Sequence, residues 1–496
     1  MDTATAWTEL KARTTELKSL EGLMGVVEWD QQVMMPAAGA PARGQQMALL
    51  SGLHHQKMTD PRIGELLDAL SEGDLDETQA ATVRNLRRDY ERAAKVPADL
   101  VKRSAVARAA AFPAWAEAKN NNDWASFQPH LEGLVGLAKE TVAAVREDQA
   151  DAYDVLLEPF DPGSTVAVLD PMFERLSAEL QTFLGAVAEA EGPAPLTGRW
   201  DVAKQNTMHQ AIAAALGFDF RSGRLDDSEH PFTVGIAHGD VRITTHIYPD
   251  GLLRGLSGTI HEVGHGLYEQ GLPGELSGLP CGGAASFGLH ESQSRFWENT
   301  IGRSRPFSGW LAGQVKTHLG QDIDPDALYG AANRVEPSLI RIFADEATYN
   351  LHIVVRYQLE RALFAGDVSV AELPGAWRET YAKVLGVAPE TDADGVLQDV
   401  HWAGAMFAYF PSYTLGNLYA ASIGAQMEED LPDLWDQVAD GHFATILKWL
   451  RENIHTRAHL QDAPDILAAK LGERDHVEDL VSYLWGRHGA LYGVSR

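Results

Sequence analysis

The sequence predicts a mainly α-helical protein with a small β-sheet. Apolar residues recur at helical spacing through most of the 496 residues, and only Pro231 to Gly251 has the pattern of a β-hairpin. No Gly/Ser-rich or Pro-rich linker and no internal repeat divides the chain. With 45% hydrophobic residues, a chain of this length can bury a large core. We therefore expect one helical domain covering residues 1–496.

The helical pattern is clearest in two stretches. In TQAATVRNLRRDYERAAK (78–95), Ala81, Leu86 and Tyr90 recur at roughly helical spacing. The stretch at 166–192 repeats the pattern and ends at Gly192-Pro193, a sequence that stops helices. Further helices are expected at 98–119, 124–149, 307–319, 336–365, 404–426 and 431–454.

The exception is PFTVGIAHGDVRITTHIYPDG (231–251). Two β-branched runs are joined by AHGD and closed by PDG, which predicts a hairpin. The run VRITTHIY is a candidate edge strand that holds an extended peptide backbone by β-addition.

Composition excludes several classes of partner. The chain has 41 Lys and Arg against 70 Asp and Glu, a formal charge of −29, with a sequence pI near 4.9. Such a surface repels nucleic acid and anionic lipid, so we expect neither a nucleic-acid partner nor a membrane partner. No signal-like segment and no run of eighteen apolar residues is present. Together with the single cysteine, Cys281, this favours a cytoplasmic protein.

The stretch GTIHEVGHGLYEQG (258–271) carries the most specific motif. His261 and His265 are four residues apart, so a helix presents both imidazoles on one face, about 6 Å apart at Cβ. They can bind one metal ion, and Glu262 can reach a metal-bound water. Gly264 and Gly266 each cost a helix up to about 1 kcal/mol, which suggests close approach to a neighbouring element. The alternative is a purely structural histidine pair.

A catalytic zinc needs a third protein ligand. The stretch AASFGLHESQSRFWEN (284–299) offers His290, Glu291 and Glu298, and spacing leaves the choice between Glu291 and His290 open. Glu298 lies two helical turns beyond Glu291 and is a candidate to support the ligands.

Several motifs together resemble the carboxypeptidase Taq family of thermostable zinc carboxypeptidases. The HEVGH helix followed by HESQSRFWEN carries the resemblance most strongly. Six further matches extend it over nearly the whole chain: EWDQQVMMP (28–36), HPF (230–232), DVRITT (240–245), IRIFADEATYNLH (340–352), GVLQDVHW (395–402) and FAYFPSYTLGN (407–417).

The resemblance implies a metal site and a reaction. His261, His265 and Glu291 would bind one zinc per subunit, with Glu262 as the catalytic general base. Histidine and carboxylate ligands also suit cobalt. The implied enzyme is a metallocarboxypeptidase with broad specificity, not favouring proline. It releases single C-terminal residues from peptides with a free C-terminus, by Glu-assisted attack of a zinc-bound water.

The resemblance also implies an elongated, helical zincin-like fold, with the small sheet beside the active site, and usually a homodimer. Its metal-binding core would cover about 225–420. The helices at about 1–200 contain no catalytic motif, so we expect them to form a wall or lid of a groove. In related zincins an acidic residue often stands four positions after the third ligand, but Arg295 stands there in this chain.

A carboxypeptidase must bind the terminal carboxylate, and an arginine suits that task in so acidic a chain. Arg341 is the preferred candidate, ahead of Arg242 and Arg295; its alternative is a helix ion pair with Asp345 at i+4. Further candidates for substrate binding or for stabilising the oxyanion each have a structural alternative: His230, His401, Tyr409 and Tyr413.

Two other functions remain open. One is a zinc oligoendopeptidase of the helical HExxH type, which would also cut peptides with an amidated C-terminus. The other is a binding protein that keeps the fold and has lost activity, against which the intact HExxH motif and Glu291 argue.

Overall fold

The computed structural model describes residues 1–496. Contacts within the chain divide it into two compact units. Unit 1 is made of three stretches, Met1–Ala94, Pro195–Ala332 and Tyr419–Arg474. Unit 2 is made of Lys95–Ala194, Asn333–Leu418 and Asp475–Arg496. The expected single peptidase domain, and its division at about 1–200 and 225–420, stay predictions.

Unit 1 holds the sheet and the HExxH helix. Its helices and strands are α1 (Thr3–Val33), α2 (Ala40–Met58), α3 (Pro61–Ser71), α4 (Glu77–Lys95), α9 (Val202–Leu216), β1 (Gly223–Asp227), β2 (Thr233–Ala237), β3 (Asp240–Thr245), α10 (Leu252–Glu269), α11 (Phe287–Arg295), the π-helix η4 (Phe296–Ile301), α12 (Arg305–Leu319), α13 (Pro325–Ala332), α17 (Leu434–Ala439), α18 (Ala444–Asn453) and α19 (Ala463–Leu471).

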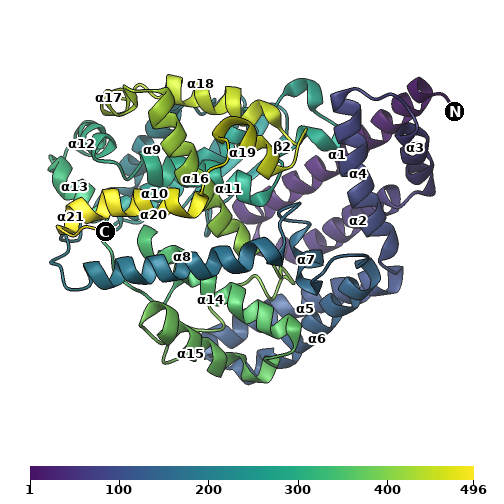
Figure 1. The fold of residues 1–496 in the computed structure, drawn as a ribbon, viewed down its shortest axis with the longest axis horizontal. Coiled ribbons are helices and arrows are strands. Elements are labelled where there is room, and N and C mark those ends of the chain that lie inside the picture. The colour runs from purple at the N-terminus through teal and green to yellow at the C-terminus, as the bar shows by residue number, and fades with distance from the viewer. The chain divides into compact units, whose positions relative to one another are not determined.

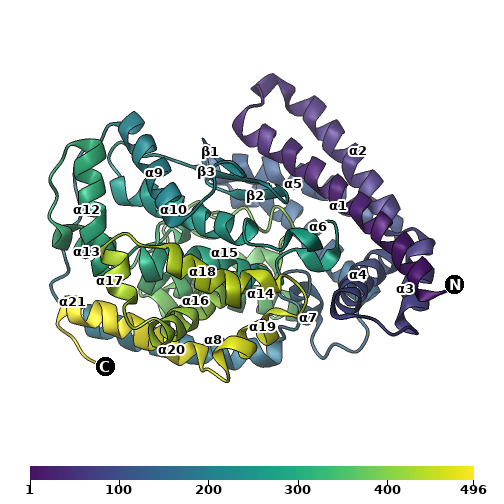
Figure 2. The same ribbon diagram turned by 90° about the horizontal axis from the view of Figure 1, so that it is seen from above.

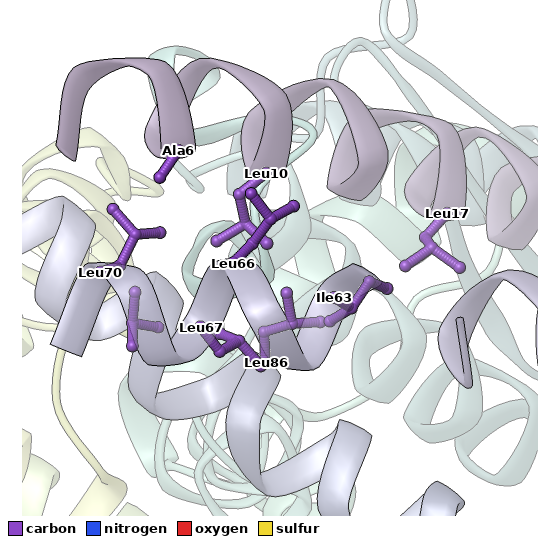
Figure 3. Packing of buried hydrophobic residues seen from close by; sticks show 9 residues of the cluster. Ala6, Leu10, Leu17, Ile63, Leu66, Leu67, Leu70 and Leu86 are labelled. Carbon is purple, nitrogen blue, oxygen red and sulfur yellow. The ribbon is translucent and has the colours of Figure 1, made fainter. Parts of the chain in front are cut away.

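A leucine-rich cluster fixes the N-terminal helices. The side chain of Asp60 caps the N-terminus of α3, and Pro61 is the first residue of the helix. Its apolar residues recur at helical spacing and face those of α1 and α4 (Figure 3). The members of this cluster are Ala6, Leu10, Leu17, Ile63, Leu66, Leu67, Leu70, Val83 and Leu86.

The sheet has three strands in the order β1-β3-β2. The expected hairpin is present: β2 and β3 pair antiparallel, and Gly239 turns with a positive φ of 87°. β1, which the sequence pattern did not reveal, pairs parallel with β3. β3 is therefore the central strand, and the expectation that VRITTHIY serves as a free edge is wrong. The sheet packs against α10 (Figure 2), so it lies beside the HExxH motif as expected.

Unit 2 contains helices, turns and irregular segments but no β-strand. Its elements are α5 (Ala98–Asn121), α6 (Trp124–Val145), α7 (Ala152–Leu157), α8 (Val166–Val187), the 3₁₀ turn η5 (Arg341–Phe343), α14 (Glu346–Ala365), α15 (Leu373–Leu385), α20 (His476–Leu484) and α21 (Ala490–Tyr492). The long helix α8 packs against α14, α15 and α20 (Figure 1). The helix α16 (Phe410–Asp430) contains the boundary between the two units.

Three predicted helices have different limits. The stretch 336–365 is not one helix, because Pro337 disfavours helical backbone before it and the Asp345 side chain caps α14. The stretch 404–426 becomes helical only at Phe410, since Ala405 and Ala408 are left-handed. The stretch 431–454 is divided into α17 and α18, with Gly441 between them at a φ of 72°. No helix of the chain combines the length and the hydropathy that a membrane span requires.

Candidate metal centre

The two glycines of α10 lie where other elements come closest. A Cβ on Gly264 would lie 2.6 Å from the carbonyl oxygen of Gln293 and from Cα of Ser294, in α11. A Cβ on Gly266 would lie 2.7 Å from the ring of Phe218. Backbone contact at Gly264 is what lets α11 run close beside the HExxH helix. The suggested close approach is therefore present.

Glu291 of α11 lies with the two HExxH histidines. Its Oε2 is 3.6 Å from Nε2 of His261 and 3.3 Å from Nε2 of His265. One ligand atom from each of the three residues lies within 4.8 Å of the others. His290 is turned to other partners: its Nδ1 contacts His265 Nδ1 at 2.6 Å, and its Nε2 contacts Glu269 Oε1 at 2.8 Å. Of the two open candidates, only Glu291 reaches this position.

A second carboxylate stands behind His261. Glu298 Oε2 lies 2.8 Å from His261 Nδ1, and Ser257 donates to Glu298 Oε1 at 2.7 Å. Glu298 belongs to the π-helix η4 that continues α11. Short π-helical segments recur at functional sites because they change the direction of side chains.

Arg295 links the two carboxylates. Its Nε donates to Glu291 Oε1 at 2.7 Å and its Nη1 to Glu298 Oε2 at 3.2 Å. Ser294 Oγ also donates to Glu291 Oε2. Arg295 is one of the candidates for binding the substrate carboxylate, but its guanidinium instead donates to two carboxylates of the site. Glu298, rather than a residue four positions after Glu291, is the acid that contacts a histidine of the motif.

The charges at the centre favour ionised carboxylates. Burial alone would favour neutral acids, yet Arg295 and His261 hold the pKa of Glu291 well below its usual range. For His261, burial opposes protonation, but Glu291 and Glu298 outweigh it and raise its pKa to about 9. Burial lowers the pKa of His265 to about 3. Glu291 and Glu298 therefore stabilise positive charge on His261.

Glu262 lies on the same helix but has a different environment. It is buried, and Thr233 of β2 donates its hydroxyl to Glu262 Oε2 at 2.7 Å and to the Glu262 carbonyl at 3.1 Å. Burial raises the pKa of Glu262 above its ordinary value. Thr233, not singled out from sequence, thus fixes the carboxylate to the sheet. A desolvated carboxylate with a raised pKa suits proton transfer near neutral pH.

The donor set of two imidazoles and one carboxylate fits a divalent metal of the zinc type. Both Nε2 atoms face Glu291 Oε2, and the two Nδ1 atoms are occupied by Glu298 and His290. Bonds from the remote nitrogen are how proteins fix the ring orientation of metal-binding histidines.

Unit 2 contains a second polar cluster, centred on Asp399. Arg341 donates to Asp399 Oδ1 through Nε and Nη2, at 3.0 and 2.9 Å, and Arg356 donates to Oδ2 at 2.6 Å. Both arginines are buried. The alternative considered for Arg341, a helix ion pair with Asp345, is absent, because Arg341 lies in the turn η5 and Asp345 caps α14. Two guanidinium groups against one carboxylate leave the cluster with a net positive charge.

His401, Tyr409 and Tyr413 belong to this second cluster. His401 Nε2 lies 3.1 Å from the Tyr413 hydroxyl, and its ring is 5.5 Å from that of Tyr409. The Arg341 guanidinium lies 4.9 Å from the Tyr413 ring centre. Burial lowers the pKa of His401 to about 3, so its imidazole is neutral at physiological pH. Four of the five substrate-binding candidates therefore lie together.

His230 is the exception. It is exposed in the segment between β1 and β2, in unit 1, whereas the other four belong to unit 2.

A buried acid, Glu360, lies next to the second cluster and was not identified as important from the sequence. Glu360 accepts hydrogen bonds from Trp402 Nε1 at 2.6 Å, the Tyr153 hydroxyl at 2.6 Å and the backbone N–H of Ala408 at 2.9 Å. Burial raises its pKa to about 7. Ala408 has a positive φ of 65°, so Glu360 stabilises a strained residue just before Tyr409. Glu360 lies in a stretch with an ordinary helical pattern, so nothing in the sequence distinguished it as a functional residue.

A HExxH helix whose histidines converge with a glutamate from the following helix, in a mainly helical fold, defines a metallopeptidase. Comparison with known proteins identifies the family of metallopeptidases to which the chain belongs. The model of the carboxypeptidase Taq (M32) metallopeptidase family matches residues 9–488, and the chain belongs to this family.

The similarity covers whole chains. Thermostable carboxypeptidase 1 of Thermus thermophilus is 42% identical over 98% of this chain and 98% of its own length. Carboxypeptidase 1 of Bacillus subtilis is 38% identical over 95% of each chain. The crystal structure of the M32 carboxypeptidase from Deinococcus radiodurans R1 superposes with a TM-score of 0.96 at 35% identity, covering 99% of this chain and 100% of that one. The protein is therefore a metallocarboxypeptidase.

Proposed function

We propose that this chain is a zinc-dependent carboxypeptidase that releases single C-terminal residues from peptides. Its specificity is broad and does not favour proline. The observation that carries the proposal is the convergence of His261, His265 and Glu291, whose ligand atoms lie within 4.8 Å of one another. In this assignment the three residues hold one zinc per subunit, and cobalt can take its place.

The metal, when bound, supplies Lewis-acid activation of water and of the scissile carbonyl. Glu262 is the general base: its buried carboxylate, oriented by Thr233, takes the proton of the attacking water and passes it to the leaving amine. The raised pKa of Glu262 supports this role, since the group must both accept and return a proton near neutral pH.

Recognition of the free C-terminus is assigned to the second cluster. Arg341, with Arg356 and Asp399, leaves one net positive charge in a chain whose formal charge is −29, and such a charge attracts a carboxylate. His401, Tyr409 and Tyr413 supply polar atoms and ring edges around the Arg341 side chain. His230 is kept as a weaker candidate, because it is exposed and outside this group.

The remaining parts of the proposal rest on family membership and composition. The protein would act as a homodimer in the cytoplasm, on peptides with a free C-terminus. The helices in about the first 200 residues would form a wall or lid that limits how peptides enter.

A time course on one unstructured peptide, followed by mass spectrometry, tests the proposal. Two forms of the peptide are compared, one with a free and one with an amidated C-terminus. We expect a ladder losing one residue at a time from the free peptide alone, abolished by a chelator and restored by zinc or cobalt. Glu262→Gln should abolish the ladder while zinc still binds. Internal cuts in both peptides would instead indicate a zinc oligoendopeptidase.

A further inference from the structure

A chain of three side chains begins at Nδ1 of His265, the ring nitrogen that faces away from Glu291, and ends at Glu269 of α10. His265 Nδ1 lies 2.6 Å from His290 Nδ1, and His290 Nε2 lies 2.8 Å from Glu269 Oε1. All three side chains are only partly exposed, with 15% for His265 and 22% each for His290 and Glu269. The proposed function uses neither His290 nor Glu269.

The protons of this chain can be placed from the contacts. His265 Nε2 faces Glu291, so in a metal site it must be unprotonated and His265 must carry its proton on Nδ1. His265 Nδ1 then donates to His290 Nδ1, which has to be an acceptor. The proton of His290 is therefore on Nε2, where it donates to the Glu269 carboxylate. Only one arrangement of protons satisfies both contacts with two neutral imidazoles.

We infer that His290 and Glu269 are positioning residues for the metal. They fix the tautomer and the ring orientation of His265, and they deliver the negative charge of Glu269 to it through His290. The inference rests on the proposed assignment of His261, His265 and Glu291 as the ligands. It gives His265 an indirect carboxylate support, whereas His261 contacts its carboxylate, Glu298, directly.

The surroundings of Glu269 support a specific role. Glu269 is the last residue of α10, where a carboxylate meets the negative end of the helix dipole and costs free energy. Room for it is provided by Gly235 of β2, since a Cβ there would lie 2.4 Å from Glu269 Oε2. The other side of His290 is bounded by the Tyr268 ring, 5.2 Å from it. The position of the Glu269 carboxylate thus favours a hydrogen bond with the His290 imidazole, although it is unfavourable for the helix.

The alternative is an ordinary ion pair that stabilises the fold and has no effect on the metal. Measuring zinc affinity and thermal stability separately distinguishes the two roles. We would prepare apoprotein with a chelator, titrate Zn²⁺ against a competing fluorescent chelator, and record thermal melts of the same apoproteins. The variants are Glu269→Gln, His290→Ala, His290→Asn and the double variant Glu269→Gln/His290→Ala, with His442→Asn on an exposed histidine as control.

We expect His290→Ala to raise the Kd for zinc about 10- to 100-fold, because supporting hydrogen bonds typically contribute that much to metal affinity. His290→Asn should recover part of the loss, since its Oδ1 can accept from His265 Nδ1. Glu269→Gln keeps the shape of the side chain and removes only the charge, so it should raise the Kd while the apoprotein melts as the wild type does. The double variant should bind zinc no more weakly than His290→Ala, because Glu269 acts only through His290.

Wild-type zinc affinity in Glu269→Gln would overturn the inference, as would full additivity in the double variant. Failure of the proposed ligand set gives a different result: the wild type would then bind zinc no better than His261→Ala does. Because Glu269→Gln preserves shape, it decides the question even where His290→Ala fails to fold.

Discussion

Glu298 Oε2 lies 2.8 Å from Nδ1 of His261, although it stands seven residues beyond Glu291. Glu298 lies in the π-helix η4, which continues α11, and it contacts His261, whereas Glu291 contacts both His261 and His265. Arg295 lies between the acids and contacts both. The carboxylates of Glu291 and Glu298 can therefore both stay ionised on one side of the candidate centre.

The hydrogen bond from Thr233 to Glu262 should set the acid limb of activity. This bond lowers the pKa of Glu262, in opposition to burial, which raises it. Thr233→Val removes the hydroxyl, so the pKa of Glu262 should rise by up to about one unit. Because a general base works only when it is deprotonated, the acid limb of kcat/KM should move to higher pH by the same amount.

The measurement is kcat/KM on a short peptide between pH 5 and 8. Thr317→Val is the matched control, since the Thr317 hydroxyl is exposed and donates only to the carbonyl of Gly313. An acid limb at the same pH in Thr233→Val and wild type would remove Thr233 from the mechanism.

Gly264 should tolerate no side chain. The added Cβ of Gly264→Ala would meet the backbone of Gln293 and Ser294 at 2.6 Å, so α11 has to move away from α10 and carry Glu291 with it. We expect a loss of about 3 kcal/mol in the free energy of unfolding, together with weaker zinc binding.

Gly309, within α12, provides the comparison. Nothing lies within 4 Å of a Cβ there, so Gly309→Ala should stabilise the protein by about 0.5–1 kcal/mol. Thermal melts with and without zinc measure both effects. Equal stability of Gly264→Ala and Gly309→Ala would show that α11 can move away from α10 without loss of stability.

Asp399 forms ion pairs with two buried arginines, and its charge should be essential to the stability of unit 2. Asp399→Asn leaves the guanidinium groups of Arg341 and Arg356 without their carboxylate, which typically destabilises a fold by about 3–5 kcal/mol. Asp322→Asn breaks an exposed ion pair with Lys316 and should cost less than about 1 kcal/mol. Chemical denaturation compares the two; similar small losses would indicate that the cluster is not anchored by charge.

Glu360 should make stability depend on pH. Burial raises its folded-state pKa to about 7, above its ordinary value of 4.5. Its contribution to stability is therefore complete below about pH 4.5 and is lost as the pH rises through about 7. The 2.5-unit difference corresponds to about 3 kcal/mol across this window.

Glu360→Gln removes the titration and keeps the shape of the side chain. The difference in unfolding free energy between wild type and variant should fall with rising pH by up to that amount. Denaturation curves at pH 4.5, 6 and 8 measure it. A difference that stays constant over this range would mean that Glu360 is ionised throughout.

The sequence indicated those features that depend on neighbours in the chain. HExxH is a local spacing on one helix, so His261 and His265 could be placed on a common face before their surroundings were known. The AHGD turn and its flanking β-branched runs likewise predicted β2 and β3. The glycines of α10 indicated close packing because they weaken the helix that contains them.

Other features depend on partners far along the chain. Arg341 and Asp399 are 58 residues apart, and the local i+4 spacing to Asp345 pointed to the wrong acid. β1 has a polar sequence, GRLDD, and becomes a strand because β3 offers it a backbone to pair with. Glu269 and the π-helix at Glu298 had no local signal either, since a helical pattern does not reveal where one turn widens.

Unit 1 is made of three separate stretches of the chain, so its parts are synthesised at different times. His455, in its third stretch, lies within 3.0 Å of Gln293 Oε1 and packs on Tyr268, so it closes the back of the α10–α11 pair. A ribosome adding about 5–20 residues per second needs roughly 8–30 s to make the 160 residues from Arg295 to His455. During that interval the α10–α11 pair lacks the contacts that His455 makes with Gln293 and Tyr268. The metal ligands are thus translated long before the segment that completes their support.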